Sequence, residues 1–175
     1  MDLRELAKEA TMKKSQRVLT VAAISALTLG VAGVAVMSMS NTALADVSCH
    51  NINAKGTGQD FGGGQTQADI TGGGLLHGTT QGQFTSTATA DPHVFTLTGT
   101  VTFTPNNTNY GTLTLAVTGT FNTAVGDFAA SGPVTGSTGK LAGATGNLTF
   151  TGNENLAAGT FTETVDGNIC ADLAP

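Results

Sequence analysis

Glu163 is the residue whose sequence neighbours point most directly to chemistry. In the segment from Thr160 to Cys170 it lies an even number of positions from Phe161 and from Ile169. A strand here would therefore carry its carboxyl on the same apolar face as these two side chains. A carboxyl in an apolar cavity is costly to ionise, and such perturbed groups recur at functional sites. Glu163 is therefore a candidate ligand-binding residue. The alternatives are an outward bulge at this position, or pairing of the carboxyl with Lys140 or a threonine hydroxyl.

Two cysteines lie near the two ends of the segment from residue 46 to residue 175. If the chain is exported to an oxidising compartment, Cys49 and Cys170 should form a disulfide that closes a loop of about 120 residues. The alternative is a catalytic pair of Cys49 with His50, which requires a free thiolate. The two cysteines have no C-x-x-C spacing, and this excludes a zinc framework built on such a motif.

The histidines and glycine-rich segments match no catalytic or cofactor motif. His50, His77 and His93 are separated by intervals that fit no local metal-binding pattern, so we expect no metal site. The dipeptide Gly139-Lys140 lacks the other residues of a phosphate-binding loop, and the chain has no G-x-S-x-G motif. We therefore expect no cofactor and assign no catalytic residue.

Strands are the elements that must position these groups. Residues 46–175 contain 27 threonines and 22 glycines, a composition that favours strands separated by turns. Two consecutive runs alternate strictly between apolar residues and threonine. Their apolar members are Phe95, Leu97, Val101 and Phe103 in the first run, and Leu113, Leu115, Val117 and Phe121 in the second. Alternation with period two predicts antiparallel sheet with one buried and one wet face.

Six further segments bring the expected total to about eight strands. They are Asn51 to Lys55, Gln67 to Thr71, Gln81 to Thr89, Phe128 to Thr135, Asn147 to Thr151, and Thr160 to Cys170. A sheet of this size with short turns removes its edges by closing into a barrel or forming a sandwich. We expect an all-β fold, a single closed antiparallel barrel over residues 46–175. Its common interior should receive Phe95, Leu113, Phe150 and Phe161.

The first 45 residues have the order of a secretory signal. Basic residues precede an apolar stretch from Val18 to Val36, and small residues follow up to Ala45. We expect cleavage between Ala45 and Asp46 and a secreted or periplasmic protein, with Met12 as an alternative start of translation. There are two alternatives. The apolar stretch could be an uncleaved membrane anchor, or the chain could be a lipoprotein that is acylated at Cys49.

The charge of residues 46–175 restricts the partners of the domain. This segment has two lysines, no arginine and nine acidic residues, a formal net charge of −7 with histidine neutral. Nucleic acids and anionic membranes are bound through clusters of basic side chains. We therefore expect no nucleic-acid partner, and no membrane partner once the signal is removed.

A glycine-rich segment carries a resemblance to a known family. The run from Gly136 to Phe150, continued by Gly159-Thr160-Phe161 and Gly167-Asn168-Ile169, resembles the glycine-rich hairpin of the allene oxide cyclase and dirigent barrel superfamily. The resemblance implies an eight-stranded antiparallel barrel with an apolar lumen open at one end. It also implies a homo-oligomer, often a trimer, and, in plant members, activity on oxylipins or phenolic radicals.

The site residues of that superfamily are only partly present. Dirigent-type sites use an arginine in the lumen, and residues 46–175 contain none. The first strand of the cyclases carries a glutamate and an asparagine two residues apart. Here the similar stretch reads Asn51-Ile52-Asn53, so the resemblance makes Asn53 a second candidate ligand-binding residue without the accompanying acid.

The function expected from these observations is the binding of a small apolar molecule in the lumen of a secreted barrel. One alternative is an isomerase or cyclase acting on an oxylipin-like epoxide. Another is a structural or surface protein without a ligand, to which repeated Thr-x-Thr steps could contribute an adhesive or ice-binding face. Such a face must be flat, whereas the strands of a barrel twist.

Overall fold

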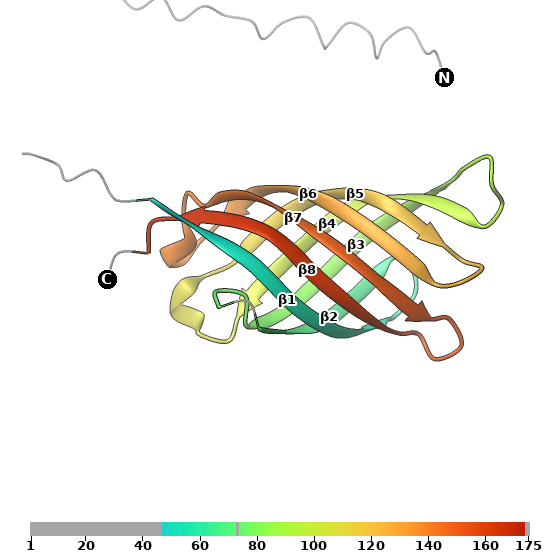
Figure 1. Ribbon diagram of the computed structural model, residues 1–175, viewed down its shortest axis with the longest axis horizontal. Helices are drawn as coiled ribbons and strands as arrows, with labels where there is room; N and C mark the ends of the chain where they lie inside the picture. Colours follow the sequence, from blue (N-terminus) through green and yellow to red (C-terminus); the bar gives the residue numbers. More distant parts are fainter. Residues whose placement is uncertain (1–46, 73, 174–175) are drawn as a thin grey trace, which may run out of the picture. The chain divides into compact units, whose positions relative to one another are not determined.

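The structure is a computed structural model that describes residues 47–72 and 74–173. The expected signal peptide and its cleavage site between Ala45 and Asp46 lie outside these residues. Eight antiparallel strands follow one another around a closed barrel, and β8 pairs with β1 to complete it (Figure 1). The strands are β1 (Ser48–Asp60), β2 (Gln65–Gly72), β3 (Gly78–Ala88), β4 (Val94–Pro105), β5 (Leu113–Asn122), β6 (Asp127–Ser137), β7 (Thr145–Asn155) and β8 (Thr160–Ala171).

The predicted all-β barrel is confirmed, and each predicted segment corresponds to one strand. Several strands are longer than expected because glycines on the inner face interrupt the apolar pattern without ending the strand. In β1, for example, Gly56 and Gly58 pair with Glu163 and Phe161 of β8. These glycines have no side chain of their own and leave room for larger neighbours.

Alternation along the strands separates an apolar interior from a threonine-rich exterior. In β5, Leu113, Leu115 and Val117 are fully buried, whereas Thr118 and Thr120 are exposed. Three of the four residues expected to share the interior, Leu113, Phe150 and Phe161, belong to the buried core. Phe95 differs: it is half-buried and lies outside that core.

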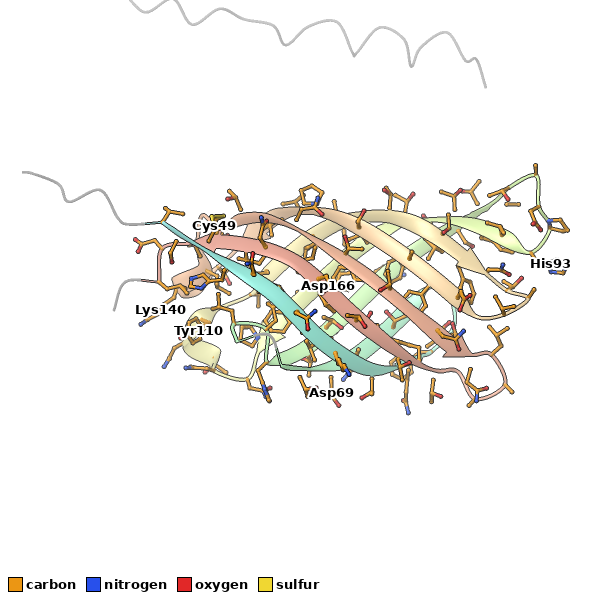
Figure 2. All side chains as sticks on the ribbon, viewed as in Figure 1. Cys49, Asp69, His93, Tyr110, Lys140 and Asp166 are labelled. Atoms are coloured by element: carbon orange, nitrogen blue, oxygen red, sulfur yellow. A yellow bond between two sulfur atoms is a disulfide. The ribbon has the colours of Figure 1, made fainter. Side chains whose placement is uncertain are left out.

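The position of Phe95 explains its exposure. It pairs with Ala88 of β3 close to the β3–β4 turn, whose tip carries His93 at one extreme of the barrel (Figure 2). The interior at that height is not filled by core side chains. Phe95 therefore lies at the rim of the barrel, where its register partner on the neighbouring strand β5 is Phe121.

The two ends of the barrel are built differently. One end is covered by the 3-10 helices η1 (Thr108–Tyr110) and η2 (Gly139–Leu141) and by buried side chains that include Leu76 and Leu141. Tyr110 is half-buried and packs against the core there. Figure 2 shows Tyr110 and Lys140 at this closed end, opposite His93. The hairpins β1–β2, β3–β4, β5–β6 and β7–β8 surround the other end.

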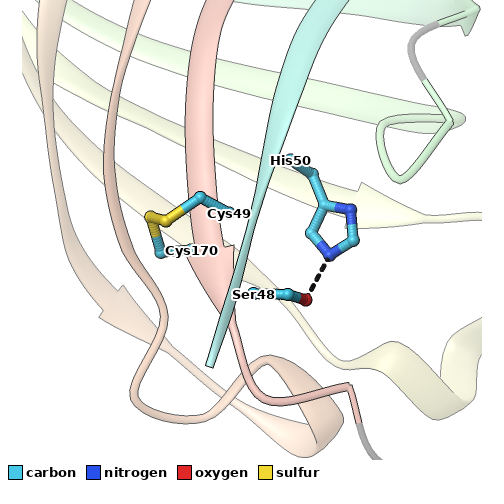
Figure 3. Close-up of a disulfide and its surroundings, with 4 residues drawn as sticks. All are labelled: Ser48, Cys49, His50 and Cys170. Atoms are coloured by element: carbon cyan, nitrogen blue, oxygen red, sulfur yellow. Dashed lines mark hydrogen bonds between the residues drawn. A yellow bond between two sulfur atoms is a disulfide. The ribbon is translucent and has the colours of Figure 1, made fainter. Parts of the chain in front are cut away.

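A disulfide joins the two strands that close the barrel. Cys49 of β1 and Cys170 of β8 are register partners, with their Cα atoms 3.9 Å apart and their sulfur atoms 2.02 Å apart (Figure 3). The expected pairing is therefore confirmed. It occupies both thiols of the chain, which removes a nucleophilic Cys49 with His50. The imidazole of His50 instead lies 2.9 Å from the hydroxyl of Ser48.

Candidate ligand-binding site

The barrel encloses a cavity of about 610 Å³ in the half that faces the open end. This volume lies within the range of small-molecule sites, roughly 300–1,000 Å³. The apolar part of the wall comes from the six strands β3 to β8, and its side chains are Phe84, Leu97, Val101, Phe121, Phe128, Ala130, Phe150 and Phe161. The closed end contributes nothing to this wall, because Leu113, Leu141 and Ile169 fill the barrel there.

Inward-facing glycines create part of this space. A Cβ atom on Gly152 would lie 2.5 Å from Cζ of Phe128, and one on Gly82 would overlap the ring of Phe84. Each of these rings therefore lies over the bare backbone of a neighbouring glycine. The absence of a side chain at these two glycines therefore leaves space that the phenylalanine rings occupy.

Glu163 projects into this cavity from β8. Its register partners are Gly56 of β1 and Gly152 of β7, so neither neighbouring strand places a side chain beside it. Alternation correctly placed it on the inner face, and no bulge occurs at this position. Lys140 cannot pair with it, because η2 lies at the closed end (Figure 2).

The carboxyl of Glu163 has no hydrogen-bond partner among the described residues. It is partly buried against apolar groups, and this loss of hydration raises its pKa from 4.5 to about 7. Its oxygens are not sealed off, since no fully buried side-chain oxygen in the described residues lacks a partner. The group therefore presents unused hydrogen-bonding capacity to the lumen.

Two further carboxylates stand at the mouth of the cavity. Asp60 at the end of β1 and Glu154 at the end of β7 both line it. Burial and then the nearby charge of Asp60 raise the pKa of Glu154. Neither residue was among the candidates predicted from the sequence. Alternation from Ile52 and Ala54 would have placed Asp60 on the inner face, but the strand predicted from the sequence ended at Lys55, before it reached Asp60.

Large apolar side chains are exposed on three of the four hairpins around the mouth. They are Phe61 after β1, Val125 after β5 and Leu156 after β7. Together with the carboxylates they give the entrance a mixed apolar and acidic rim. The polar wall groups include Thr66 near the start of β2, and Thr80, which is buried deeper in the barrel beside Phe103.

Asn53 does not belong to this cavity. It lies on the outer face of β1, exposed, and its side-chain amide donates a 2.6 Å hydrogen bond to Asp166 of β8. Adjacent residues on a strand point to opposite faces, and Ile52 and Ala54 occupy the inner one. The structure therefore does not bring Asn53 and Glu163 together, and Asn53 is not part of the lumen.

Two other depressions lack comparable chemistry. One of about 680 Å³ runs over the outer face of β1 and β8 between exposed side chains such as Gln59, Gln67 and Thr162. Another of about 390 Å³ lies at the closed end beside Leu75, His77 and Tyr110. In contrast to both, the lumen combines an apolar enclosure with an unpartnered carboxyl.

Neither a metal cluster nor a membrane helix is found in the described segments. Residues 47–72 and 74–173 contain no group of three histidine, cysteine, aspartate or glutamate side chains that could hold a metal ion. The same residues include no helix long and apolar enough to cross a membrane. Comparisons with protein-family models, curated proteins and solved structures found no match to this chain.

Proposed function

We propose that this protein is an exported binding protein that holds a small, mainly apolar molecule in the lumen of its barrel. The observation that carries the proposal is the cavity of about 610 Å³, which combines phenylalanine walls with the unpartnered carboxyl of Glu163. Empty apolar space is costly in a protein interior, so a cavity of this size requires an occupant or a function. The disulfide between Cys49 and Cys170 is compatible with a secreted or periplasmic location.

We further propose that the chain is a member of the allene oxide cyclase and dirigent barrel superfamily. The closed eight-stranded meander supports this proposal, because it is the architecture that the glycine-rich resemblance implies. Only the fold is carried over. The described residues place no arginine in the lumen, and Asn53 lies outside it, so they do not reproduce the site residues of the plant members.

Native mass spectrometry of protein purified from its own host tests the binding proposal. The expected result is one small molecule per chain that is lost on denaturation. Ala130 lines the cavity and its neighbour Ala129 is exposed on the same strand, which offers a matched pair of variants. Ala130→Phe should fill the lumen and abolish the mass increment, whereas Ala129→Phe should retain it. A protein recovered empty from its host, with no ligand retained by either variant, would instead favour a structural role.

One observation favours a second candidate, an isomerase or cyclase acting on an oxylipin-like epoxide. The raised pKa keeps much of Glu163 protonated near neutral pH, as a general acid that opens an epoxide requires. Among the described residues, however, no cationic side chain lines the lumen to hold the carboxylate of such a substrate. Turnover of a fatty-acid epoxide that is lost in Glu163→Gln would establish this candidate, and absence of turnover would exclude it.

A further inference from the structure

The charged side chains that line the cavity all carry the same sign. They are Asp60, Glu154 and Glu163, and no lysine, arginine or histidine of residues 47–72 and 74–173 accompanies them. Lys55 is exposed on the outer face of β1, and Lys140 lies at the closed end (Figure 2). An anionic ligand would therefore be repelled at the mouth and would find no counter-charge inside.

The surroundings of Glu163 suit a positively charged group. Phe161 lies two residues away on the same inner face, and the ring of Phe128 lies over Gly152, the register partner of Glu163. These two rings form an edge-to-face pair with their centroids 5.7 Å apart and their planes at 88°. Aromatic faces attract ammonium groups that approach within about 6 Å, and more strongly where water is excluded.

The carboxyl of Glu163 supplies the second element that an ammonium group needs. It has no partner among the described residues, so a ligand would not have to displace an existing hydrogen bond. Hydrogen bonds between an ammonium and a carboxylate are shorter and stronger than neutral ones. The remaining wall is apolar and can accept a hydrocarbon or aryl body.

We propose that the lumen selects small hydrophobic amines, with the apolar body among the phenylalanines and the ammonium group bound to Glu163. This inference rests on the proposed function, because it names the chemical class of the lumen ligand. Asp60 and Glu154 act before binding, by raising the concentration of cations at the mouth and repelling anions. Fatty acids and oxylipin acids belong to the excluded class.

Three probes with the same apolar body separate the effect of charge from that of hydrophobic burial. They are 4-phenylbutylamine, 4-phenylbutan-1-ol and 4-phenylbutanoate, measured by isothermal titration calorimetry at pH 8. We expect the amine to bind at least tenfold more tightly than the alcohol, and the carboxylate at least tenfold more weakly. The alcohol reports on the apolar cavity alone.

Two variants with the same change of charge locate the effect. Glu163→Gln is nearly isosteric and should reduce the affinity for the amine at least tenfold, while the affinity for the alcohol changes less than threefold. Asp166→Asn removes a carboxylate from the outer face of the same strand, where Asp166 bonds to Asn53. It should leave the affinity for both probes within threefold of wild type, and circular dichroism checks that both variants fold.

The outcomes distinguish this inference from the proposal on which it rests. If the alcohol binds as tightly as the amine, or the carboxylate binds most tightly, selection for amines is overturned while binding of an apolar molecule stands. If Glu163→Gln and Asp166→Asn weaken the amine equally, the role of Glu163 is overturned. If none of the three probes binds and the protein from its host is empty, both proposals fail.

Discussion

The side chain of Glu163 lies directly over the backbone of Gly56, its register partner on β1. A Cβ atom on Gly56 would lie 2.7 Å from Cγ and 2.8 Å from Oε1 of Glu163, and 2.8 Å from Cδ1 of Ile70. These distances are too short for any side chain at position 56. The position of the carboxyl in the lumen thus depends on a residue that contributes no side chain to it.

Gly56→Ala should therefore displace Glu163. The added methyl group must move the carboxyl or Ile70, so we expect a loss of stability of about 1–3 kcal/mol, typical of overpacking. The affinity for 4-phenylbutylamine should fall severalfold, with a smaller change for the alcohol. Calorimetry and urea unfolding measure the two effects.

Gly136→Ala is the matched control for this substitution. Gly136 lies in β6, and a Cβ there would meet only Thr114, at an ordinary distance of 3.6 Å. Stability and binding should stay close to wild type. If Gly56→Ala had as little effect on stability and binding as this control, the position of the Glu163 carboxyl would not depend on the space over Gly56.

Glu163 should make the stability of the barrel fall as pH rises. Its pKa is about 7 in the folded protein and near 4.5 in the unfolded chain, so the folded state binds more protons between these values. The stabilisation is complete below about pH 4.5 and is lost as pH rises through 7. This difference between the pKa values in the folded and unfolded states corresponds to roughly 3 kcal/mol of folding stability.

Urea unfolding of wild type and two variants between pH 4 and 9 isolates this contribution. Glu163→Gln cannot ionise and should lack the decline between pH 4.5 and 7, while the effects of the other carboxyls cancel in the difference. Glu163→Leu should be as stable as wild type or more so at pH 8, because it removes a partly buried charge. Identical pH dependence in wild type and Glu163→Gln would show that the carboxyl is hydrated and its pKa ordinary.

Amine binding should strengthen with rising pH. Free Glu163 holds a proton below its pKa of about 7, and an ammonium ligand binds the ionised form, so binding below that pH releases a proton. Asp60 and Glu154 are the other ionisable groups in the cavity, and the neighbours of Glu163 on β1, β2 and β7 are the uncharged Gly56, Ile70 and Gly152.

Calorimetry in buffers of different ionisation enthalpy measures the proton released. We expect release at pH 6 and little at pH 8.5, with affinity rising up to tenfold per pH unit below 7. Glu163→Gln should lose most of this dependence. If the affinity of that variant for the amine still depended on pH, the dependence would be due to Glu154, whose pKa is also raised.

The sequence predicts the strands and the inward direction of Glu163 because both depend on local alternation. Parity with Phe161 and Ile169 requires no knowledge of neighbouring strands. The threonine-rich outer faces of β4 and β5 are defined in the same way. These features survive in the structure even where the predicted strand ends are several residues short.

The composition of the cavity could not be predicted locally, because it depends on register between strands. Gly56 and Gly152 flank Glu163 only through the pairing of β8 with β1 and β7. In the sequence, these glycines look like interruptions. Asn53 shows the opposite failure, since a family resemblance placed in the lumen a residue that parity with Ile52 assigns to the outer face.

Removing the disulfide should destabilise the barrel and leave the cavity intact. Cys49 and Cys170 are 121 residues apart, and loop-closure entropy assigns about 4–5 kcal/mol to a crosslink of that length. Pairing of β1 with β8 extends well beyond the disulfide, from Ser48 with Ala171 to Gln59 with Thr160, so the barrel can still close.

The double variant Cys49→Ser, Cys170→Ser tests this separation of stability from binding. Its free energy of unfolding should fall by a few kcal/mol, while its affinity for 4-phenylbutan-1-ol should change less than threefold, because the cavity lies toward the opposite end from the disulfide. Wild-type protein treated with a reductant should match the variant in both measurements and so serves as the control. Loss of alcohol binding in a variant that still shows native circular dichroism would mean that closure at Cys49 and Cys170 determines the shape of the lumen.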